Sequence, residues 1–465
     1  MTDNVLSASR RQFLQSAVAG SAGATLLQWQ AAQKLLAQTA GSSGYKALVC
    51  LFLDGGNDSF NMLTPHTAAE YDAYRATRGE PGSGGVSIDR ADLLEIAGPD
   101  GRTMGLHPSM TAVQQLYNDG HLGFIANVGS LIRPTTMTDY QAAESLPLGL
   151  FSHSDLTRHW QTAMPDTRAA LTGWGGRMAD LLTPSEKFND TIGMSIAVDR
   201  VNTFQAADSI RSYIVNSSGA ISRSGYFGNW QRDRIIRQAF DEILAQPTTD
   251  LVSQTYSQLT RQAIDAAQLY NDATASVTLE TPFPEHYLGR NLERIARTIA
   301  SADDLGHEKH IFFVSYGGWD HHGDLLGPQA NLLGRLSESL KAFYDSLVEL
   351  QVSDQVVLFT ASDFGRTLVS NGQGTDHGWG GNQIVLGGPV NGGNLFGEYP
   401  QSLAENDLDV GRGRLIPTLS VDQYAAELAM WMGIGNDSNL ESVLPNIRNF
   451  YPQGQQGPPI GFLNA

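Results

Sequence analysis

The chain has 465 residues, of which 41% are hydrophobic and 17% are charged, enough apolar side chains for one large globular domain or two. Its formal net charge is -18, and so acidic a surface repels phosphate backbones, which argues against a nucleic-acid-binding function. The single cysteine, Cys50, excludes an intramolecular disulfide and lies in an apolar run, where we expect a buried and inert thiol.

The first forty residues have the pattern of an export signal. Arg10 and Arg11 precede a Phe–Leu pair and a weakly apolar stretch of small residues that ends near Leu27. This stretch is too short and too polar for a membrane-spanning helix, which needs ~20 apolar residues. Because the pattern resembles a twin-arginine signal, we expect residues 1–40 to be a signal peptide and spacer, and the protein to be periplasmic or secreted. An ordinary basic tail is the alternative.

A strand–helix–strand pattern begins the remaining chain. Residues 47–53 are fully apolar, as in a strand that is buried on both faces of a parallel sheet, with Asp54 at its tip and Asp58 shortly after. A long loop-rich stretch follows. Residues 107–118 have helical spacing, and residues 122–128 resemble a second strand. This order predicts an α/β fold with a mostly parallel central sheet flanked by helices.

The middle of the chain changes character. Ser152 stands at the N-cap of the next predicted helix, and Asp155 three residues later gives the form of a capping box. Residues 205–280 have polar, helical spacing without strand signals, so we interpret them as a helical insertion in a single domain that spans residues 41–465. This insertion is the surface on which we expect a protein partner, if there is one.

The second half of the chain alternates strands and helices again. It contains predicted strands at residues 311–316, 356–360 and 384–386 and predicted helices at residues 287–302, 329–350 and 421–432. No segment after the signal is long and apolar enough to span a bilayer, so we expect no stable membrane span.

Acids and histidines follow several of these strands directly. The candidate metal ligands are Asp54, Asp58, Asp320, His322, Asp363 and His377, and Asp376 precedes the last of them. The carboxyl ends of parallel strands share one edge of the sheet, where clustered carboxylates would repel one another unless a cation intervened. Carboxylate oxygen and imidazole nitrogen suit a divalent ion such as zinc or manganese. The alternative is that these acids cap turns and helices.

Five motifs, in order along nearly the whole chain, carry a resemblance to a known family. They are the arginine pair, LDGGND at 53–58, GGWDHH at 317–322, SDFGRT at 362–367 and DHGWGG at 376–381. On these motifs the chain resembles the exported family called domain of unknown function 1501, within the alkaline phosphatase-like superfamily that includes sulfatases. The resemblance implies an alkaline phosphatase-like fold and one or two divalent ions, whether zinc, manganese, magnesium or calcium.

The resemblance also implies which residues hold the ions. Asp54 matches the superfamily's first-strand Asp, Asp320 and His322 match the ligands of one metal, His377 matches the last His, and Asp363 matches the Asp that serves the second metal. Two departures matter. The step from Asp320 to His322 is shorter than usual, so His321 or Asp324 is an alternative ligand. Phe364 stands where a histidine usually serves the second metal, so we expect one metal or a weak second site.

The resemblance places the nucleophile at a helix N-terminus after the second strand, where Ser152 fits best and where orphan N–H groups stabilise an attacking alkoxide. A simple N-cap is the alternative role of Ser152. Weaker candidates for the nucleophile are Ser154, Ser130 and Ser59. His153, with His159 nearby, is a candidate acid or substrate ligand. Arg366 is a candidate clamp for phosphate or sulfate, or else the partner of an acid.

The sequence therefore predicts an exported metal-dependent hydrolase that acts on a phosphate or sulfate ester, in a small molecule or a polymer, through a serine nucleophile. A non-catalytic binding or assembly protein on the same scaffold is the alternative, to which Phe364 points. A metal-dependent oxidoreductase ranks last, because no nucleotide-binding G-x-G-x-x-G follows a strand with the required acid downstream.

Overall fold

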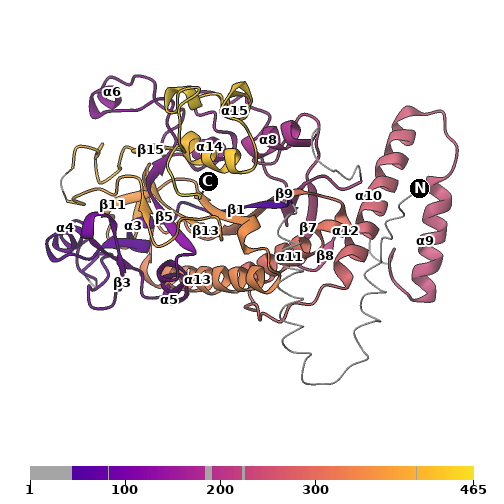
Figure 1. The fold of residues 1–465 in the computed structure, drawn as a ribbon, viewed down its shortest axis with the longest axis horizontal. Coiled ribbons are helices and arrows are strands. Elements are labelled where there is room, and N and C mark those ends of the chain that lie inside the picture. The colour runs from indigo at the N-terminus through magenta and orange to yellow at the C-terminus, as the bar shows by residue number, and fades with distance from the viewer. Residues whose placement is uncertain (1–43, 82, 184–190, 222–225, 405, 465) are drawn as a thin grey trace, which may run out of the picture. The chain divides into compact units, whose positions relative to one another are not determined.

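The computed structural model describes residues 44–464 apart from 82, 184–190, 222–225 and 405, so the expected signal peptide lies outside the described residues. Tyr45–Ala465 form one compact unit. Its described residues build a ten-stranded sheet in the order β14-β5-β13-β10-β1-β9-β6-β7-β8, with β15 paired to β5 (Figure 1). Parallel pairs dominate the sheet, which confirms the predicted fold class.

Three parallel strands form the middle of the sheet. The strand β1 (Lys46–Asp54) lies between β10 (Val356–Ser362) and β9 (Lys309–Gly317). Successive side chains of β1 enter different hydrophobic cores, Val49 on one face and Cys50 on the other, which explains why the run is apolar throughout. Cys50 is buried, as expected, and burial raises the pKa of its thiol.

Further strands extend both sides of this centre. Beyond β9 come the parallel β6 (Ser195–Val198) and β7 (Tyr213–Asn216) and then the antiparallel β8 (Gly219–Ala220). Beyond β10 come the antiparallel β13 (Gly381–Leu386), then β5 (Leu122–Gly129), with the short β14 (Leu395–Phe396) and β15 (Leu419–Ser420) parallel to β5. The sequence pattern located β13 but did not indicate its direction.

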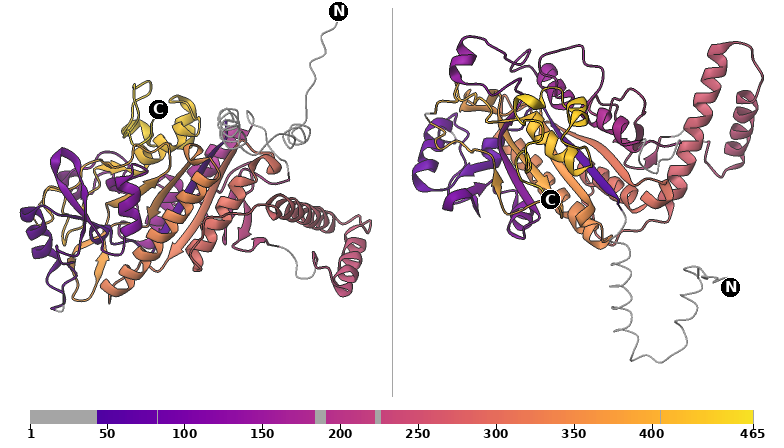
Figure 2. Two further views of the ribbon diagram at one scale, coloured as in Figure 1. Left: turned by 60° about the horizontal axis from the view of Figure 1, so that its bottom comes forward. Right: turned by 45° about the horizontal axis from the view of Figure 1, so that its top comes forward.

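Helices cover both faces of the sheet (Figure 2). One face carries α5 (Thr111–Asn118), α11 (Tyr287–Ala300) and α13 (Leu326–Glu349), whose apolar stripes enter one core. The other face carries α7 (His153–Thr162), α8 (Trp174–Leu182) and α14 (Val421–Trp431), which enter the second core. Among the described helices, none is both long and apolar enough to cross a membrane.

Three regions differ from the sequence-based expectation. The stretch expected to be loop-rich contains α4 (Ala68–Arg78) and a small sheet of β2 (Leu63–Pro65), β3 (Leu94–Ala97) and β4 (Thr103–Leu106). The first predicted helix begins at Thr111 rather than at residue 107. Within the expected helical insertion of residues 205–280, β7 and β8 pair with the sheet, and the helices among the described residues there are α9 (Gln231–Leu244) and α10 (Leu251–Ala275).

Short elements complete the chain. They are α3 (Ser59–Met62), α6 (Met137–Gln141), α12 (Ala302–Leu305) and α15 (Ser438–Val443), and the hairpin of β11 (Arg366–Ser370) with β12 (Thr375–His377). The hairpin follows β10 directly and lies at the carboxyl edge of the central strands, where it carries His377.

Candidate metal centre

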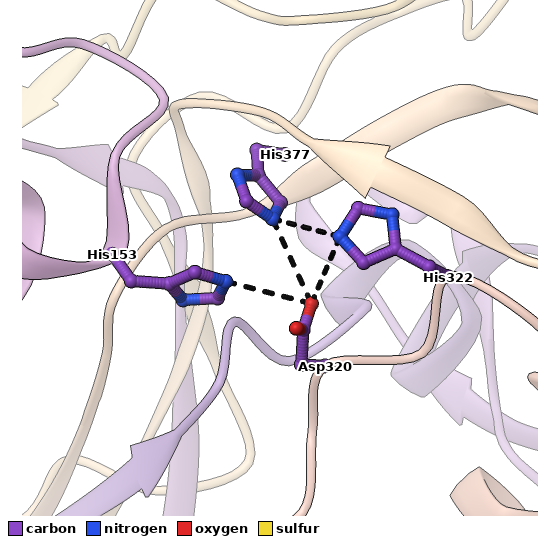
Figure 3. A group of neighbouring side chains, drawn as sticks. All are labelled: His153, Asp320, His322 and His377. Carbon is purple, nitrogen blue, oxygen red and sulfur yellow. Dashed lines mark hydrogen bonds and ion pairs between the residues drawn. The ribbon is translucent and has the colours of Figure 1, made fainter.

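Four side chains meet at the carboxyl edge of the central strands. His153, Asp320, His322 and His377 each present one nitrogen or oxygen, and these four atoms all lie within 4.8 Å of one another (Figure 3). His153 is the first residue of α7, Asp320 and His322 follow β9, and His377 ends β12. The cluster therefore joins three segments that are far apart in the sequence.

A glycine lets the tips of β1 and β9 come together. Gly55, directly after β1, has a φ of +122°, and a Cβ there would lie 2.7 Å from the backbone nitrogen of Asp320. Any side chain at this position would clash with the backbone that carries Asp320, so the Asp-Gly-Gly sequence after β1 is a packing requirement of the site.

The distances in the cluster fit a small cation. Oδ1 of Asp320 lies 3.1 Å from Nε2 of His322, 3.5 Å from Nε2 of His153 and 3.7 Å from Nε2 of His377. The two Nε2 atoms of His322 and His377 are 2.8 Å apart. Ligand atoms of a tetrahedral zinc site, with bonds of ~2.0–2.1 Å, lie about 3.3 Å apart. The observed distances lie on both sides of this spacing.

The opposite ring nitrogen of each histidine is held by an acceptor. Nδ1 of His153 lies 2.7 Å from Oδ2 of Asp363, Nδ1 of His377 lies 2.7 Å from the carbonyl oxygen of Phe151, and Nδ1 of His322 lies 3.1 Å from Oδ1 of Asp376. Carbonyl and carboxylate oxygens only accept, so each Nδ1 carries the proton and donates it. In the neutral form such an imidazole has its Nε2 lone pair free to bind a cation, the arrangement typical of histidines in metal sites.

Neighbouring charged side chains shift the pKa values of the cluster residues: Arg366 contacts Asp320, and Asp363 contacts His153. Burial opposes ionisation of Asp320, but the hydrogen bond from Nη1 of Arg366 at 3.0 Å and its charge lower the pKa of the carboxyl overall. The hydrogen bond to Asp363 raises the pKa of His153, whereas burial lowers that of His377. Nε2 of His153 is buried and has no hydrogen-bond partner among the described residues, an orphan that a bound cation would satisfy.

Asp363 and Asp54 lie at the same edge as the cluster but contact other groups. Asp363 is buried, accepts from the backbone N–H of Gly55 at 3.0 Å and orients His153. Asp54 accepts from Arg200 at 2.7 Å. Asp363 therefore holds His153 from the side of Nδ1, and Asp54 pairs with the guanidinium of Arg200. Neither carboxylate is among the four cluster atoms.

Asp58 lies in a different environment from the cluster. Its side chain is fully buried, with Oδ1 2.7 Å from Nη2 of Arg78 and Oδ2 accepting from Thr375 at 2.8 Å. Both oxygens are therefore engaged in a buried ion pair. The structure does not bring Asp58 to the metal cluster, and its role is to anchor α4 beneath the hairpin of β11 and β12.

Arg366 does not have a free guanidinium. The side chain is buried, its Nη1 donates to the carbonyl oxygen of Gly55 and to Asp320, and its Nε and Nη2 donate to the carbonyl oxygen of Thr375. This is the alternative role considered from the sequence, pairing with an acid, and the acid is Asp320. Arg366 orients Asp320, and each of its three guanidinium nitrogens already donates to a protein acceptor.

Ser152 is the N-cap of α7, directly before the ligand His153. Its Oγ lies 3.1 Å from Oγ of Ser154 and accepts from the backbone N–H of Asp155 at 3.5 Å. These described contacts stay within the first turn of the helix.

Two alternative ligands lie outside the four-residue cluster. The ring of His321 is buried, and burial together with the charge of Arg366 lowers its pKa. Of the three residues considered after β9, His322 belongs to the cluster, and His321 and Asp324 do not. Phe364 packs its ring 4.8 Å from that of His153 and 4.6 Å from that of His377, so an apolar wall stands where a further ligand was considered.

Sequence reasoning missed part of the site. It treated His153 as a candidate acid or substrate ligand and not as a metal ligand, although its position after the N-cap brings its Nε2 into the cluster. It gave no role to Asp376, whose pKa is lowered to about 2 because hydrogen bonds from Asn371, His322 and Arg412 outweigh burial. The Asp-His pair at 376–377 was the available signal; no motif marked the rim arginines Arg200 and Arg412.

Solved structures resemble the chain only loosely. The PsFucS1 sulfatase from Pseudoalteromonas sp. is 12% identical, over 79% of this chain and 68% of that chain, with a TM-score of 0.32. The C-terminal periplasmic domain of EcEptC from Escherichia coli is 9% identical, over 89% and 88%, with a TM-score of 0.34. The lipoteichoic acid synthase LtaP from Listeria monocytogenes is 8% identical, over 78% and 68%, with a TM-score of 0.29. No activity follows from likeness at this level.

The family assignment is firmer. No curated protein matches the chain, but the model of one family, described as "Protein of unknown function (DUF1501)", matches residues 45–417. The matched range contains all four residues of the metal cluster and the residues that orient them. The chain belongs to the DUF1501 family.

Proposed function

We propose that His153, Asp320, His322 and His377 bind one divalent cation and that zinc is the ion that suits them best. The observation that carries this proposal is that three imidazoles are tied back through Nδ1 while their Nε2 atoms face one oxygen of Asp320. Three nitrogens and one oxygen in a tight group suit zinc, with manganese next. Magnesium and calcium prefer oxygen ligands and fit this set poorly.

The chemistry that such a centre supports is hydrolysis. A bound divalent ion would act as a Lewis acid on an ester oxygen that reaches it from the open side of the cluster. The side chains of Asp320 and His322 are 47% and 45% exposed, so solvent and substrate reach the centre from one side. The buried Arg366 and the ring of Phe364 close the other side, and they fix the ligands without occupying the open face.

The substrate class follows from the charges around the open face. Arg200, which pairs with Asp54, is 53% exposed, and Arg412, which pairs with Asp376, is 47% exposed. Arg414 stacks on the ring of Phe151 and donates to the carbonyl oxygen of His377 at 3.1 Å. Guanidinium groups at the rim of a metal centre in an otherwise acidic protein favour an anionic substrate. A phosphate or sulfate ester fits this rim.

Ser152 is the proposed nucleophile for this reaction. It stands at the N-terminus of α7 beside the ligand His153, where the helix dipole and orphan N–H groups favour an attacking alkoxide. We expect Ser152→Ala to lose activity by about two orders of magnitude or more while the protein keeps its metal, and Ser154→Ala, the matched control, to lose little. Full activity of Ser152→Ala would assign the attack to water and leave Ser152 as an N-cap.

The first test of the function is metal dependence. Full-length protein, purified after chelation and reloaded with zinc, should hold one ion per chain and hydrolyse aryl phosphate or aryl sulfate esters. His322→Ala and His377→Ala should lose both properties, and His66→Ala, outside the cluster, should keep them. Protein that binds zinc in the cluster but hydrolyses neither ester class would favour the second candidate, a non-catalytic binding protein, which the apolar wall at Phe364 supports.

Export by the twin-arginine route also remains a proposal. It rests on the arginine pair and the weakly apolar stretch in residues 1–40. Fusing these residues to a folded reporter should deliver the reporter to the periplasm, and Arg10→Lys with Arg11→Lys should retain it in the cytoplasm. Delivery that does not depend on the two arginines would contradict the proposal.

A further inference from the structure

The helices α9 and α10 expose an unusual number of large hydrophobic side chains. Figures 1 and 2 show the two helices beyond the β7–β8 edge of the sheet. The exposed side chains on them and at their start are Trp230, Ile235, Ile243, Leu251, Val252, Tyr256 and Leu259, with Trp230 81% and Ile235 61% exposed. An apolar surface of this extent, bordered by charged residues, is typical of an interface.

Specific side-chain contacts hold α9 and α10 together, so the two helices have defined positions relative to each other. Asp241 on α9 accepts from the hydroxyl of Tyr226 at 2.6 Å and from Arg261 on α10 at 2.9 Å. The ring of Phe240 packs 6.1 Å from that of Tyr226. The C-terminal half of α10 is anchored in the main core through buried residues such as Tyr270. The exposed apolar side chains therefore lie on the faces that these contacts leave open.

The open face of α9 has nearly the same pattern in both directions along the helix. Two rows of exposed residues recur every four positions: Ile235, Ala239 and Ile243 in one row, and Arg234, Gln238 and Glu242 in the other. Read backward, the first row is unchanged. In the second row the reversal exchanges the positive Arg234 with the negative Glu242, and the neutral Gln238 stays in the middle. This is the pattern that a helix needs to pair antiparallel with an identical helix across a two-fold axis.

We propose that this face of α9 docks on the same face of a second copy of this chain, antiparallel, with the two-fold axis near Ala239. Arg234 of each copy then faces Glu242 of the other, and the isoleucines pack beside the small alanine. Residues 230–261 hold four arginines and four acids, a net charge of zero, in a chain of net charge -18. Two copies therefore repel each other least where these helices meet.

The proposed interface extends to the exposed stripe of α10, the helix that α9 contacts through Asp241 and Arg261. Val252, Tyr256 and Leu259 recur at spacings of four and three, as in a helix-pairing seam. Apolar side chains of this size each bury roughly 100 Å², so the seven exposed ones account for roughly 700 Å² per copy, close to the ~800 Å² per partner of a standard stable interface.

The mass of the full-length protein in solution tests the proposal first. Sedimentation equilibrium should give twice the mass of the chain at micromolar concentration. Ile235→Glu and Ile243→Glu should give the monomer, because each places two carboxylates in the apolar row near the axis. Val348→Glu, a substitution of an exposed valine on α13, should leave the dimer intact. A wild-type monomer, or a dimer insensitive to both isoleucine substitutions, would overturn the proposal.

Charge reversal tests the antiparallel register. Arg234→Glu alone and Glu242→Arg alone should each weaken association by about tenfold or more, since each sets like charges opposite each other twice. The double variant should recover wild-type association, because each copy then offers the reversed pair. A double variant that is as weak as the singles would contradict this register.

A disulfide tests the axis itself. Cys50 is the only cysteine and is buried, so Ala239→Cys introduces the single accessible thiol. Mild oxidation should convert Ala239→Cys into a covalent dimer, whereas Val348→Cys on α13 should remain a monomer under denaturing conditions. Absence of the Ala239→Cys crosslink, or monomers that bind vesicles of anionic lipid through this face instead, would assign the face to another occupant.

Discussion

At the scale of single residues, the orientation of each cluster side chain depends on the group to which it is hydrogen-bonded. The sequence singled out Asp320, His322 and His377 from their places after predicted strands, and the structure brings these three side chains together. The sequence could not predict that Asp363 would orient His153, because that contact joins residues 210 positions apart and depends on how α7 packs. It could not show either that Asp58 would be neutralised by Arg78, since no spacing rule links α4 to the tip of β1.

Asp363 provides the sharpest residue-level prediction. Asp363→Asn removes the carboxylate that fixes the tautomer of His153 and presents an amide donor to Nδ1. We expect zinc affinity to fall about 10–100-fold, as measured by competition with a chromogenic chelator. Asp54→Asn, whose parent carboxylate pairs with Arg200 instead, should change the affinity much less. Equal losses in both variants would mean that Asp54 is a ligand too.

Two buried histidines away from the four ligand atoms predict acid sensitivity. Burial lowers the pKa of His107 and of His159 to about 4. In the unfolded chain each protonates near 6.5, so the unfolded state binds more protons as the pH falls from about 6.5 to 4, and stability must fall over that window. Urea unfolding at pH 7 and pH 4.5 measures this loss. His159→Gln should flatten the profile, and an unchanged slope would contradict the assignment.

At the scale of elements, the central strands and long helices were the predictable part. Their apolar runs and stripes pack into two cores, so pattern and burial agree. The helix α4 was missed because few of its residues are apolar and buried, and one of the buried ones is Arg78. The strands β7 and β8 were missed because they are short and only partly buried at the end of the sheet. The direction of β13 depends on chain connections that periodicity does not encode.

The attachment of α4 gives a prediction at this scale. Arg78→Leu leaves Asp58 charged and buried, so unfolding should become easier by about 3–5 kcal/mol. Arg75→Leu, on the same helix but in an exposed pair with Glu80, should cost far less, because water and salt screen an exposed ion pair. Chemical denaturation of both variants decides between them. Similar costs would show that the buried pair does not hold α4 in place.

At the scale of the whole molecule, the candidate metal cluster lies at the carboxyl edge of the central strands. The exposed apolar residues described above lie on α9 and α10. The strands β1, β9 and β10 end side by side. The loop after β9 carries Asp320 and His322, the hairpin after β10 carries His377, and α7 brings His153 to the same point. The composition predicted an acidic protein that avoids nucleic acid, but not the neutral stretch at residues 230–261, because charge totals do not show where charges lie. Losing the dimer should therefore leave zinc binding unchanged, since no cluster residue lies on those helices.

The central claim is that His153, Asp320, His322 and His377 bind one zinc ion. The X-ray absorption spectrum of the zinc-loaded protein at the zinc edge tests this claim most directly. The structure predicts a shell of about four nitrogen and oxygen neighbours at ~2.0–2.1 Å, with the outer-shell scattering of three imidazole rings that drops to two in His153→Ala. A spectrum of hydrated zinc, or one that His153→Ala leaves unchanged, would contradict it.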